Sequence, residues 1–317
     1  MQAINTGYGL IGLGSMGQNA VLNLLAQGQR VVVYDRTHEK VDEMVRMGAV
    51  GAQTIEEMAS LLARPRTVWL MVAAGKPVDD ILFGPGGLSE HFSPGDAIID
   101  GGNSFYRDSI RRAAQLKERH IHLLDCGTSG GLEGARNGMC LMVGGEVEAF
   151  QMAEPLFHLL AVEDGYARIG PSGAGHFAQM VHNGIELGML EALGEGLELL
   201  AQGPFALDLP QVTDLWQHGS AVRSQLLDLA ARALARDPHL EAITAPAGDG
   251  GDGTWAVEEG WQAGAPMAAI AVALAMRLRS RQTDSFTGRV VAAVQQERGG
   301  REAVLVGPEG QVALENP

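Results

Sequence analysis

Short apolar runs alternate with helix-like stretches through the first half of the chain. The runs are rich in Val, Ile and Leu and are bounded by Gly, Asp and Pro, a pattern typical of buried parallel strands. Predicted strands cover residues 8–12, 30–35, 67–72, 96–100, 120–125, 139–144 and 166–169. Because helical segments separate these strands, we predict an α/β fold with a doubly wound parallel sheet.

The pattern changes after Gly170 and Pro171, where strand-like runs give way to helical periodicity. A long helical stretch runs from Ser172 to about Gln202, and another covers residues 265–296. A chain of 317 residues usually needs more than one hydrophobic core. We therefore predict a sheet domain over residues 1–171 and an all-α domain over residues 172–317.

A glycine-rich turn follows the first predicted strand and opens a predicted helix. In the spacing G-x-G-x-x-G, the first glycine permits a tight turn and the second lets the backbone approach a pyrophosphate. The third lets the helix pack on the strand, and the helix N-terminus then faces the anion. The candidate cofactor-binding residues of this turn are Gly12, Leu13, Gly14, Ser15, Met16 and Gly17. The first domain is therefore predicted to be Rossmann-like and to bind a dinucleotide.

The second predicted strand ends at an acid that bears on the choice of cofactor. Asp35 follows the last glycine by about 18 residues, where an acid accepts hydrogen bonds from ribose hydroxyls and repels a 2′-phosphate. Arg36 and Thr37 come next and could instead bind a 2′-phosphate. We expect NAD as the preferred cofactor, and NADP stays open.

Three further loops follow predicted strands, at the sheet edge where ligands of such folds bind. Met71, Val72 and Ala73 lead into small residues that let a cofactor lie against the backbone. Asn103 offers both a donor and an acceptor in the next loop. The third loop joins the Ser129 hydroxyl to the amides of Gly130 and Gly131, a combination that can bind a small anion.

A polar stripe lies on the first long helix of the second half. Gln179, His182, Asn183 and Glu186 stand at i, i+3, i+4 and i+7, one above another, while Met180, Val181 and Ile185 point elsewhere. A face built from proton-handling and amide groups, without the Lys and Glu of a solvated helix, indicates the wall of a site. A histidine and an asparagine can also be satisfied groups in a core.

Composition and charge exclude several classes of protein. A formal net charge of −15 disfavours nucleic acid and anionic membranes as partners. We see neither a secretory leader nor about 18 uncharged apolar residues in a row, so we expect a cytoplasmic protein. Cys126 and Cys140 lack metal-ligand spacing, which predicts reduced, buried thiols and no metal site.

These motifs together resemble the 6-phosphogluconate dehydrogenase family, in its short bacterial form, within the β-hydroxyacid dehydrogenases. The resemblance covers nearly the whole chain. It rests on residues 12–19, 35–37, 98–108, 129–136 and 173–186. It implies oxidation of 6-phosphogluconate at C3 by hydride transfer to the nicotinamide, loss of CO₂, and protonation of the enediol to give ribulose 5-phosphate.

The resemblance also implies roles and partners. Asn103 would contact nicotinamide and substrate, and Ser129, Gly130 and Gly131 would hold the substrate carboxylate. His182 and Asn183 would bind sugar hydroxyls, Glu186 would act as general acid, and Arg277 would contact the phosphate. The partner would be a small anionic sugar acid, and a homodimer or homotetramer is expected.

The chain departs from the family at Gln179, where relatives place a lysine base. An amide accepts no proton near neutral pH, and no lysine follows Lys117. Relatives also have a basic residue where this chain has Thr254. The favoured hypothesis is a dehydrogenase in which His182 takes the proton. The alternatives are a related β-hydroxyacid dehydrogenase or a ketone or imine reductase with another substrate, and a non-catalytic NAD-binding sensor.

Overall fold

The computed structural model of the chain describes residues 7–241 and 251–281. These residues form two compact units, of which the first takes residues 7–187 and 251–270 and the second takes residues 188–241 and 271–281. The division falls inside the long helix α9 (Ala174–Gln202), whereas the sequence predicts a boundary near residue 171. The first turns of α9 are therefore part of the sheet unit.

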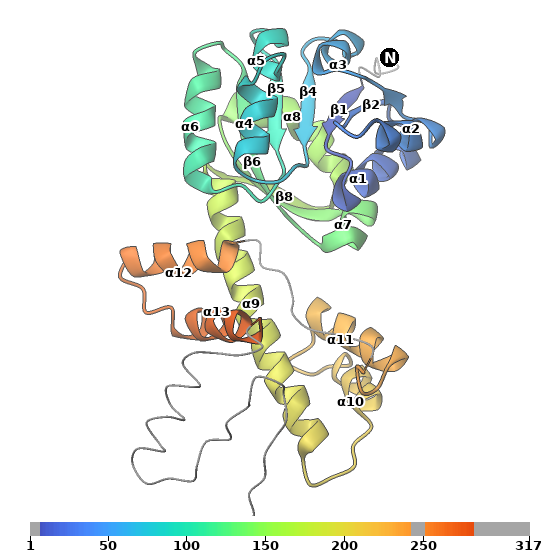
Figure 1. Ribbon diagram of the computed structural model, residues 1–317, viewed down its shortest axis with the longest axis vertical. Coiled ribbons are helices and arrows are strands. Elements are labelled where there is room, and N and C mark those ends of the chain that lie inside the picture. The colour runs from blue at the N-terminus through green and yellow to red at the C-terminus, as the bar shows by residue number, and fades with distance from the viewer. Residues whose placement is uncertain (1–6, 242–250, 282–317) are drawn as a thin grey trace, which may run out of the picture. The chain divides into compact units, whose positions relative to one another are not determined.

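An eight-stranded sheet forms the centre of the first unit (Figure 1). Its strand order is β3-β2-β1-β4-β5-β6-β7-β8. The strands are β1 (Tyr8–Ile11), β2 (Val31–Tyr34), β3 (Val50–Gly51), β4 (Thr67–Leu70), β5 (Ala97–Asp100), β6 (His122–Ser129), β7 (Met139–Gly144) and β8 (Ala161–Gly170). The prediction of a Rossmann-like α/β unit followed by a helical part is confirmed.

The sheet is mixed, in contrast to the fully parallel sheet that the sequence pattern predicts. β7 runs antiparallel to β6, and all other neighbours are parallel. Only the short helix α7 (Gly131–Asn137) joins β6 to β7, so the chain re-enters the sheet from the end at which it left. The sequence does not predict strand β3, because its two residues are too few to show the alternation of apolar and polar positions that marks a strand.

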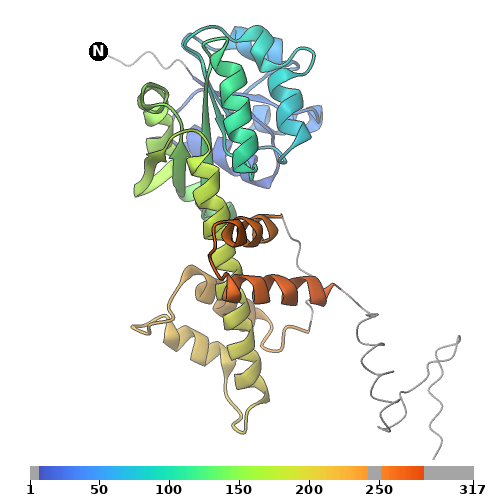
Figure 2. The same cartoon turned by 90° about the vertical axis from the view of Figure 1, so that its left-hand side faces the viewer.

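Helices cover both faces of the sheet and bury two separate apolar cores (Figures 1 and 2). One face is covered by α1 (Ser15–Ala26), α2 (His38–Arg46), α7 and α8 (Val147–Leu160). The other is covered by α3 (Ile55–Leu61), α4 (Lys76–Phe83), α5 (Leu88–His91) and α6 (Tyr106–Lys117). Strands buried on both sides explain the continuous apolar runs of the sequence.

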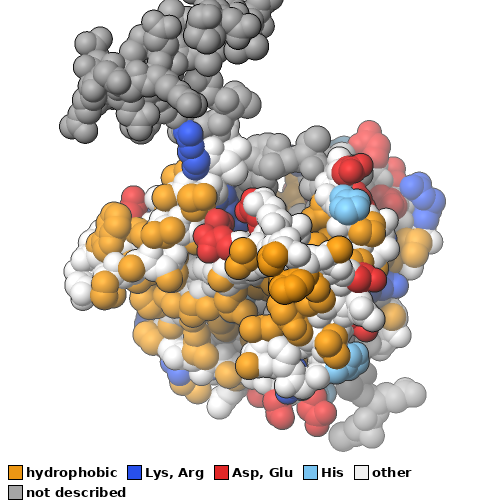
Figure 3. All heavy atoms as spheres, turned by 90° about the horizontal axis from the view of Figure 1, so that it is seen from below, with side chains coloured by type: hydrophobic (Ala, Val, Ile, Leu, Met, Phe, Trp, Pro, Cys, Tyr) orange, Lys and Arg blue, Asp and Glu red, His pale blue; other side chains and the backbone are white. Residues whose placement is uncertain are grey.

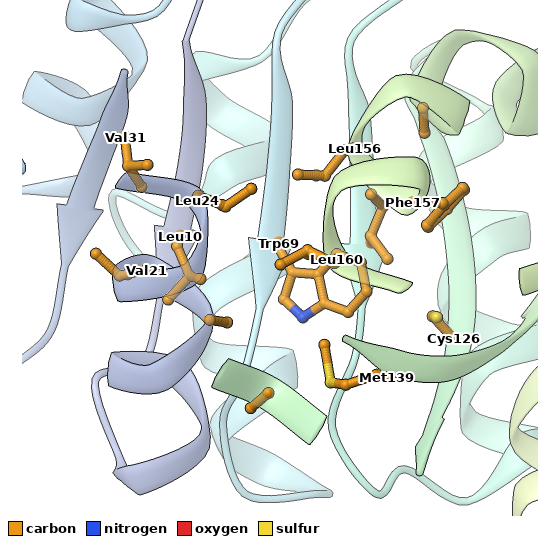
Figure 4. Close-up of a cluster of buried hydrophobic side chains, with 14 of the residues drawn as sticks. Leu10, Val21, Leu24, Val31, Trp69, Cys126, Met139, Leu156, Phe157 and Leu160 are labelled. Carbon is orange, nitrogen blue, oxygen red and sulfur yellow. The ribbon is translucent and has the colours of Figure 1, made fainter. Parts of the chain in front are cut away.

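Trp69 of β4 is the largest fully buried side chain of the first core (Figure 4). Its ring meets Phe157 of α8 edge to face, with centroids 6.1 Å apart. The labelled neighbours come from α1, β1, β2, β6, β7 and α8, so this core joins both halves of the sheet (Figure 4). The close packing keeps the carboxyl ends of the strands in fixed positions.

The remaining helices are α10 (Leu209–Trp216), α11 (Gln225–Arg236), α12 (Asp252–Gln262) and α13 (Ala268–Ser280). The predicted helix over residues 265–296 corresponds to α13, and its last part lies outside the described residues. Leu199, Phe205 and Leu215 of the second unit are each more than 60% exposed. Figure 3 shows hydrophobic side chains gathered on the face viewed there. Such surface is typical of protein contacts, and the homo-oligomer stays a prediction.

No helix within the described ranges is long and apolar enough to cross a membrane.

Candidate active site

The glycine-rich turn is tightly packed at its first and third glycines and open at the second. Gly12 has φ +99°, and a methyl group there would overlap the carbonyl oxygen of Met71. A methyl group on Gly17 would overlap the carbonyl oxygen of Gly12, which shows how closely α1 packs on β1. Gly14 has open space where its side chain would be, at the uncapped N-terminus of α1. An open backbone at a helix N-terminus fits a dinucleotide phosphate.

Asp35 ties this turn to the end of β2. Its carboxylate accepts the backbone N–H of Leu13 at 2.6 Å and that of Thr37 at 2.8 Å. Thr37 is the N-cap residue of α2, and Arg36 is exposed. A carboxylate has about four acceptor positions, so two backbone donors leave room for ribose hydroxyls. The acid therefore orders the loop and also places negative charge beside it.

Loop residues at the ends of neighbouring strands contact one another in a continuous line. The loop of Met71, Val72 and Ala73 contacts the next loop, because a methyl group on Gly102 would lie 2.6 Å from the carbonyl oxygen of Val72. Thr128 Oγ1 then donates to the carbonyl oxygen of Gly101 at 3.4 Å. Asn103 follows these glycines and is half-buried. The loop that carries Asn103 thus lies between the loop of Met71, Val72 and Ala73 and the end of β6.

Asp125 fixes the start of α9, a role that the sequence pattern does not predict. It is buried, and its two carboxylate oxygens accept the backbone N–H groups of Gly173 at 2.7 Å and His176 at 2.9 Å. Gly173 immediately precedes α9 and His176 lies in its first turn, where helices lack internal acceptors. A carboxylate at a helix N-terminus also interacts favourably with the helix dipole. β6 therefore holds the helix that carries the polar stripe.

Gln179 packs tightly against β6 and is only 4% exposed. A methyl group on Gly127 would lie 2.6 Å from its Cβ, so no larger residue fits at that point of the strand. The Gln179 Nε2–H donates to the carbonyl oxygen of Thr128 at 3.2 Å. Its amide is therefore engaged with the backbone of β6.

His182 lies one turn further along α9 and faces Ser129, the last residue of β6. Ser129 Oγ is 3.2 Å from His182 Nε2, and His182 Nδ1 is 3.0 Å from Asn183 Oδ1. Because an amide oxygen only accepts, Nδ1 donates to it, and in the tautomer with its single proton on Nδ1 the other nitrogen, Nε2, accepts the Ser129 hydroxyl. Glu186 Oε2 lies 4.0 Å from Nδ1, and both side chains are about two-fifths exposed. The stripe thus presents an imidazole that is hydrogen-bonded to Ser129, with a carboxylate beside it.

Ser129 stands at the start of a turn that has the shape of an anion site. Gly130 has φ +125° and Gly131 has φ +61°, and α7 begins at Gly131. Successive glycine amides in such conformations can point toward one ligand. The structure brings Ser129 next to His182, and Gly130 and Gly131 follow Ser129 in the chain.

Two further predicted positions lie on other helices. Arg277 lies on α13 in the second unit, so its contact with a phosphate stays a prediction. Thr254 lies on α12, next to Trp255, whose ring is 5.2 Å from that of Phe105.

The part of the chain that the structure describes holds no group of three or more His, Cys, Asp and Glu side chains arranged to bind a metal ion. Both cysteines are free thiols. Cys126 is buried as predicted, but the expectation of burial is wrong for Cys140, which alternation along β7 leaves exposed.

A dinucleotide turn, an anion-binding turn and a paired imidazole and carboxylate define a dinucleotide-dependent oxidoreductase. Residues 7–169 match the NAD binding domain of 6-phosphogluconate dehydrogenase, and residues 175–305 match the C-terminal domain of 6-phosphogluconate dehydrogenase. The chain therefore belongs to the 6-phosphogluconate dehydrogenase family.

Individual relatives agree with this assignment. YqeC of Bacillus subtilis, named as an inferred 6-phosphogluconate dehydrogenase, is 47% identical over 92% of this chain and 97% of its own length. The NAD(+)-dependent decarboxylating 6-phosphogluconate dehydrogenase of Haloferax volcanii is 39% identical over 89% of this chain and 93% of its own. The solved 6-phosphogluconate dehydrogenase of Plasmodium falciparum has a TM-score of 0.80 and 31% identity over 96% of this chain and 67% of that one.

Proposed function

We propose that this protein catalyses the NAD-dependent oxidative decarboxylation of 6-phosphogluconate, or of a close sugar acid, to ribulose 5-phosphate and CO₂. The C3 hydroxyl is oxidised to a ketone, the resulting β-keto acid loses CO₂, and the enediol is protonated. The named activities of the relatives support the reaction, and the hydrogen-bonded pair of Ser129 and His182 is the observation that carries it for this chain.

Different groups of the chain bind the cofactor and the substrate for the oxidation at C3. The glycine turn and the loop of Met71, Val72 and Ala73 hold the dinucleotide, whose nicotinamide accepts the hydride from C3 when bound. Ser129 and the amides of Gly130 and Gly131 bind the substrate carboxylate, and Asn103 binds between carboxylate and nicotinamide. In this arrangement the reacting carbon lies near His182.

His182 accepts the hydroxyl proton in this proposal. With the Nδ1 proton bound by Asn183, the Nε2 lone pair accepts the Ser129 hydroxyl, so the proton of the C3 hydroxyl passes to Nε2 through Ser129. Glu186, 4.0 Å from Nδ1, stabilises the imidazolium that forms. After CO₂ leaves, the proton that His182 took from the C3 hydroxyl passes to Glu186, which gives it to the enediol carbon and is a carboxylate again. General acid or base catalysis of this kind contributes about 10²–10⁴-fold.

Gln179 has a positioning role here. Its buried amide donates to the carbonyl of Thr128, and this contact sets the distance between α9 and the residue before Ser129. A lysine, which the family resemblance leads one to expect here, would put an ammonium group into the same buried position.

The cofactor preference follows from Asp35. Its carboxylate lies at the ribose end of the turn and repels the two negative charges of a 2′-phosphate. Arg36 is exposed beside it and offers a 2′-phosphate a partial counter-charge. We propose NAD as the main cofactor, with measurable use of NADP.

Product stoichiometry tests this function. The purified protein is mixed with NAD and 6-phosphogluconate, gluconate or a short 3-hydroxy acid, and NADH and CO₂ are measured together. We expect equal amounts of both products, with 6-phosphogluconate the best substrate. NADH without CO₂ would instead support another β-hydroxyacid dehydrogenase, and NADPH or NADH consumption with cyclic imines or ketones would support a reductase. Cofactor binding with turnover of none of these compounds would support the sensor.

A further inference from the structure

Arg112 of α6 is completely buried, although arginine rarely is. Its guanidinium group points to three different partners. Nε donates to Asp79 Oδ1 at 2.9 Å, Nη1 donates to Ser104 Oγ at 3.2 Å, and Nη2 donates to the carbonyl oxygen of Gly75 at 3.0 Å. One planar cation thus joins three points of the chain.

These three points belong to the two loops that flank the proposed nicotinamide position. Gly75 ends the loop after β4 and is the N-cap residue of α4, and Asp79 lies in the first turn of that helix. Ser104 ends the loop after β5, next to Asn103. The loops touch each other, because a methyl group on Gly102 would lie 2.6 Å from the carbonyl oxygen of Val72.

The loop after β5 is tethered on both sides of Asn103. Ser104 Oγ donates to Asp100 Oδ2 at 2.7 Å, and Asp100 Oδ1 accepts the backbone N–H of Gly102 at 3.2 Å. Arg112 Nη1 lies 3.6 Å from Asp100 Oδ2, and both of these side chains are fully buried. The guanidinium group therefore neutralises the carboxylate that shapes the loop around Asn103.

An ion pair with Asp79 holds the guanidinium group on the side of α4. Burial by itself raises the pKa of Asp79, but hydrogen bonds from Arg112 and Arg111 outweigh it and hold that pKa below its usual value. Asp79 is thus a firm anion at neutral pH, and it fixes the guanidinium that binds Gly75. A lysine could not reproduce this, since an ammonium group lacks the fixed planar fork of donors.

We propose that Arg112 is a positioning residue that holds the loops of residues 71–75 and 100–104 in the register that productive dinucleotide binding requires. It acts through Gly75 and Ser104 and does not itself touch the cofactor. This inference rests on the proposed function for the place of the nicotinamide ring, and it assigns a cofactor role to a residue outside the site.

Arg66 provides a matched control in the same unit. It is also almost buried, and it pairs with Asp96 at 2.8 Å and donates to the carbonyl oxygens of Ala59 and His91. It stands before β4 and its partner before β5, at the edge of the sheet opposite to the cofactor loops. Substitution of Arg66 or of Arg112 removes a buried arginine with several hydrogen bonds, but only substitution of Arg112 disturbs the loops of residues 71–75 and 100–104.

The experiment compares Arg112→Lys and Arg112→Ala with Arg66→Lys and Arg66→Ala. Melting temperature, the Kd of NADH by fluorescence titration, and kcat and KM for NAD are measured. We expect all four variants to melt lower. Only the Arg112 variants should bind NADH at least about tenfold more weakly and lose up to about 10²-fold in kcat, as a displacement near 1 Å does. Millimolar guanidinium chloride should restore NADH affinity to Arg112→Ala, whereas equal sodium chloride should not.

Two outcomes would overturn the inference. One is Arg112 variants that melt lower but keep the Kd of NADH within about twofold of the wild type, as the Arg66 variants should. The other concerns Ser104→Ala, which is used if the Arg112 variants fail to fold and which removes the hydroxyl that Nη1 binds. This variant should weaken NADH binding, and unchanged NADH binding would contradict the inference. NADH titration needs no sugar acid, so a wild type that binds NADH but turns over no substrate would refute only the proposed function.

Discussion

Gly127→Ala would place a methyl group where β6 meets α9. The new Cβ would lie 2.6 Å from Gln179 Cβ and 2.9 Å from the carbonyl oxygen of Gly175. Non-bonded carbon atoms normally stay about 3.5–4.0 Å apart. The helix must therefore retreat from the strand by about 1 Å to accommodate the methyl group.

The expected loss follows from this displacement. Overpacking of a closely packed contact costs about 1–3 kcal/mol of unfolding free energy. Retreat of α9 also lengthens the 3.2 Å contact between Ser129 Oγ and His182 Nε2. A displacement near 1 Å at reacting groups costs about 10²-fold in rate. We expect a lower melting temperature together with a fall of that order in kcat/KM.

Gly194→Ala is the control for this variant. Gly194 also lies on α9, but nothing stands within 4 Å of the position that its Cβ would take. Alanine there should raise helix stability by up to about 1 kcal/mol and leave activity unchanged. Chemical denaturation and steady-state NADH formation are measured for both. A Gly127→Ala variant with wild-type kcat/KM and stability would refute the close packing of α9 on β6.

Three further results are expected. A thiol reagent should modify exposed Cys140 in the native protein but reach Cys126 only in denaturant, since Cys126 is buried and burial raises the pKa of its thiol. Labelling of the folded Cys140→Ser variant, in which only Cys126 remains, would contradict this. Asp79→Asn should lower the free energy of unfolding at neutral pH. Burial raises the pKa of Asp79, but the adjoining guanidinium groups of Arg112 and Arg111 lower it by more, so the folded state stabilises the carboxylate. The contribution of the Asp79 carboxylate to stability is therefore complete above about pH 4 and disappears as the pH falls through the folded-state pKa. A stability difference between the wild type and Asp79→Asn that persists at low pH would refute this prediction. Asp35→Asn should raise the ratio of kcat/KM for NADP over NAD at least about tenfold, and an unchanged ratio would show that Asp35 does not select the cofactor.

Local patterns were enough to predict much of the fold. The glycine turn at Gly12, Gly14 and Gly17 was predictable because its spacing reflects steric needs of one strand, one turn and one helix. The polar stripe on α9 was predictable because residues that stand three and four apart share a helix face. The antiparallel direction of β7 was not, since it depends on how short α7 turns out to be.

Contacts between distant segments explain what the sequence pattern missed. Arg112 lies in an arginine-rich stretch that reads as a solvated helix, and only its contacts with Gly75 and Ser104 show that it is buried. Asp125 stands at the end of a predicted strand, but its partners lie about 50 residues further along the chain. The burial of Gln179 likewise depends on Gly127, which no periodicity connects to it.

The pH dependence of kcat/KM for 6-phosphogluconate, measured for the wild type and His182→Asn, tests most directly the claim that His182 accepts the hydroxyl proton. We predict that activity of the wild type falls on the acid side as the imidazole becomes protonated. The variant should be slower by about 10²–10⁴-fold and should lack this acid limb. A variant that keeps both the wild-type rate and the acid limb would contradict the account.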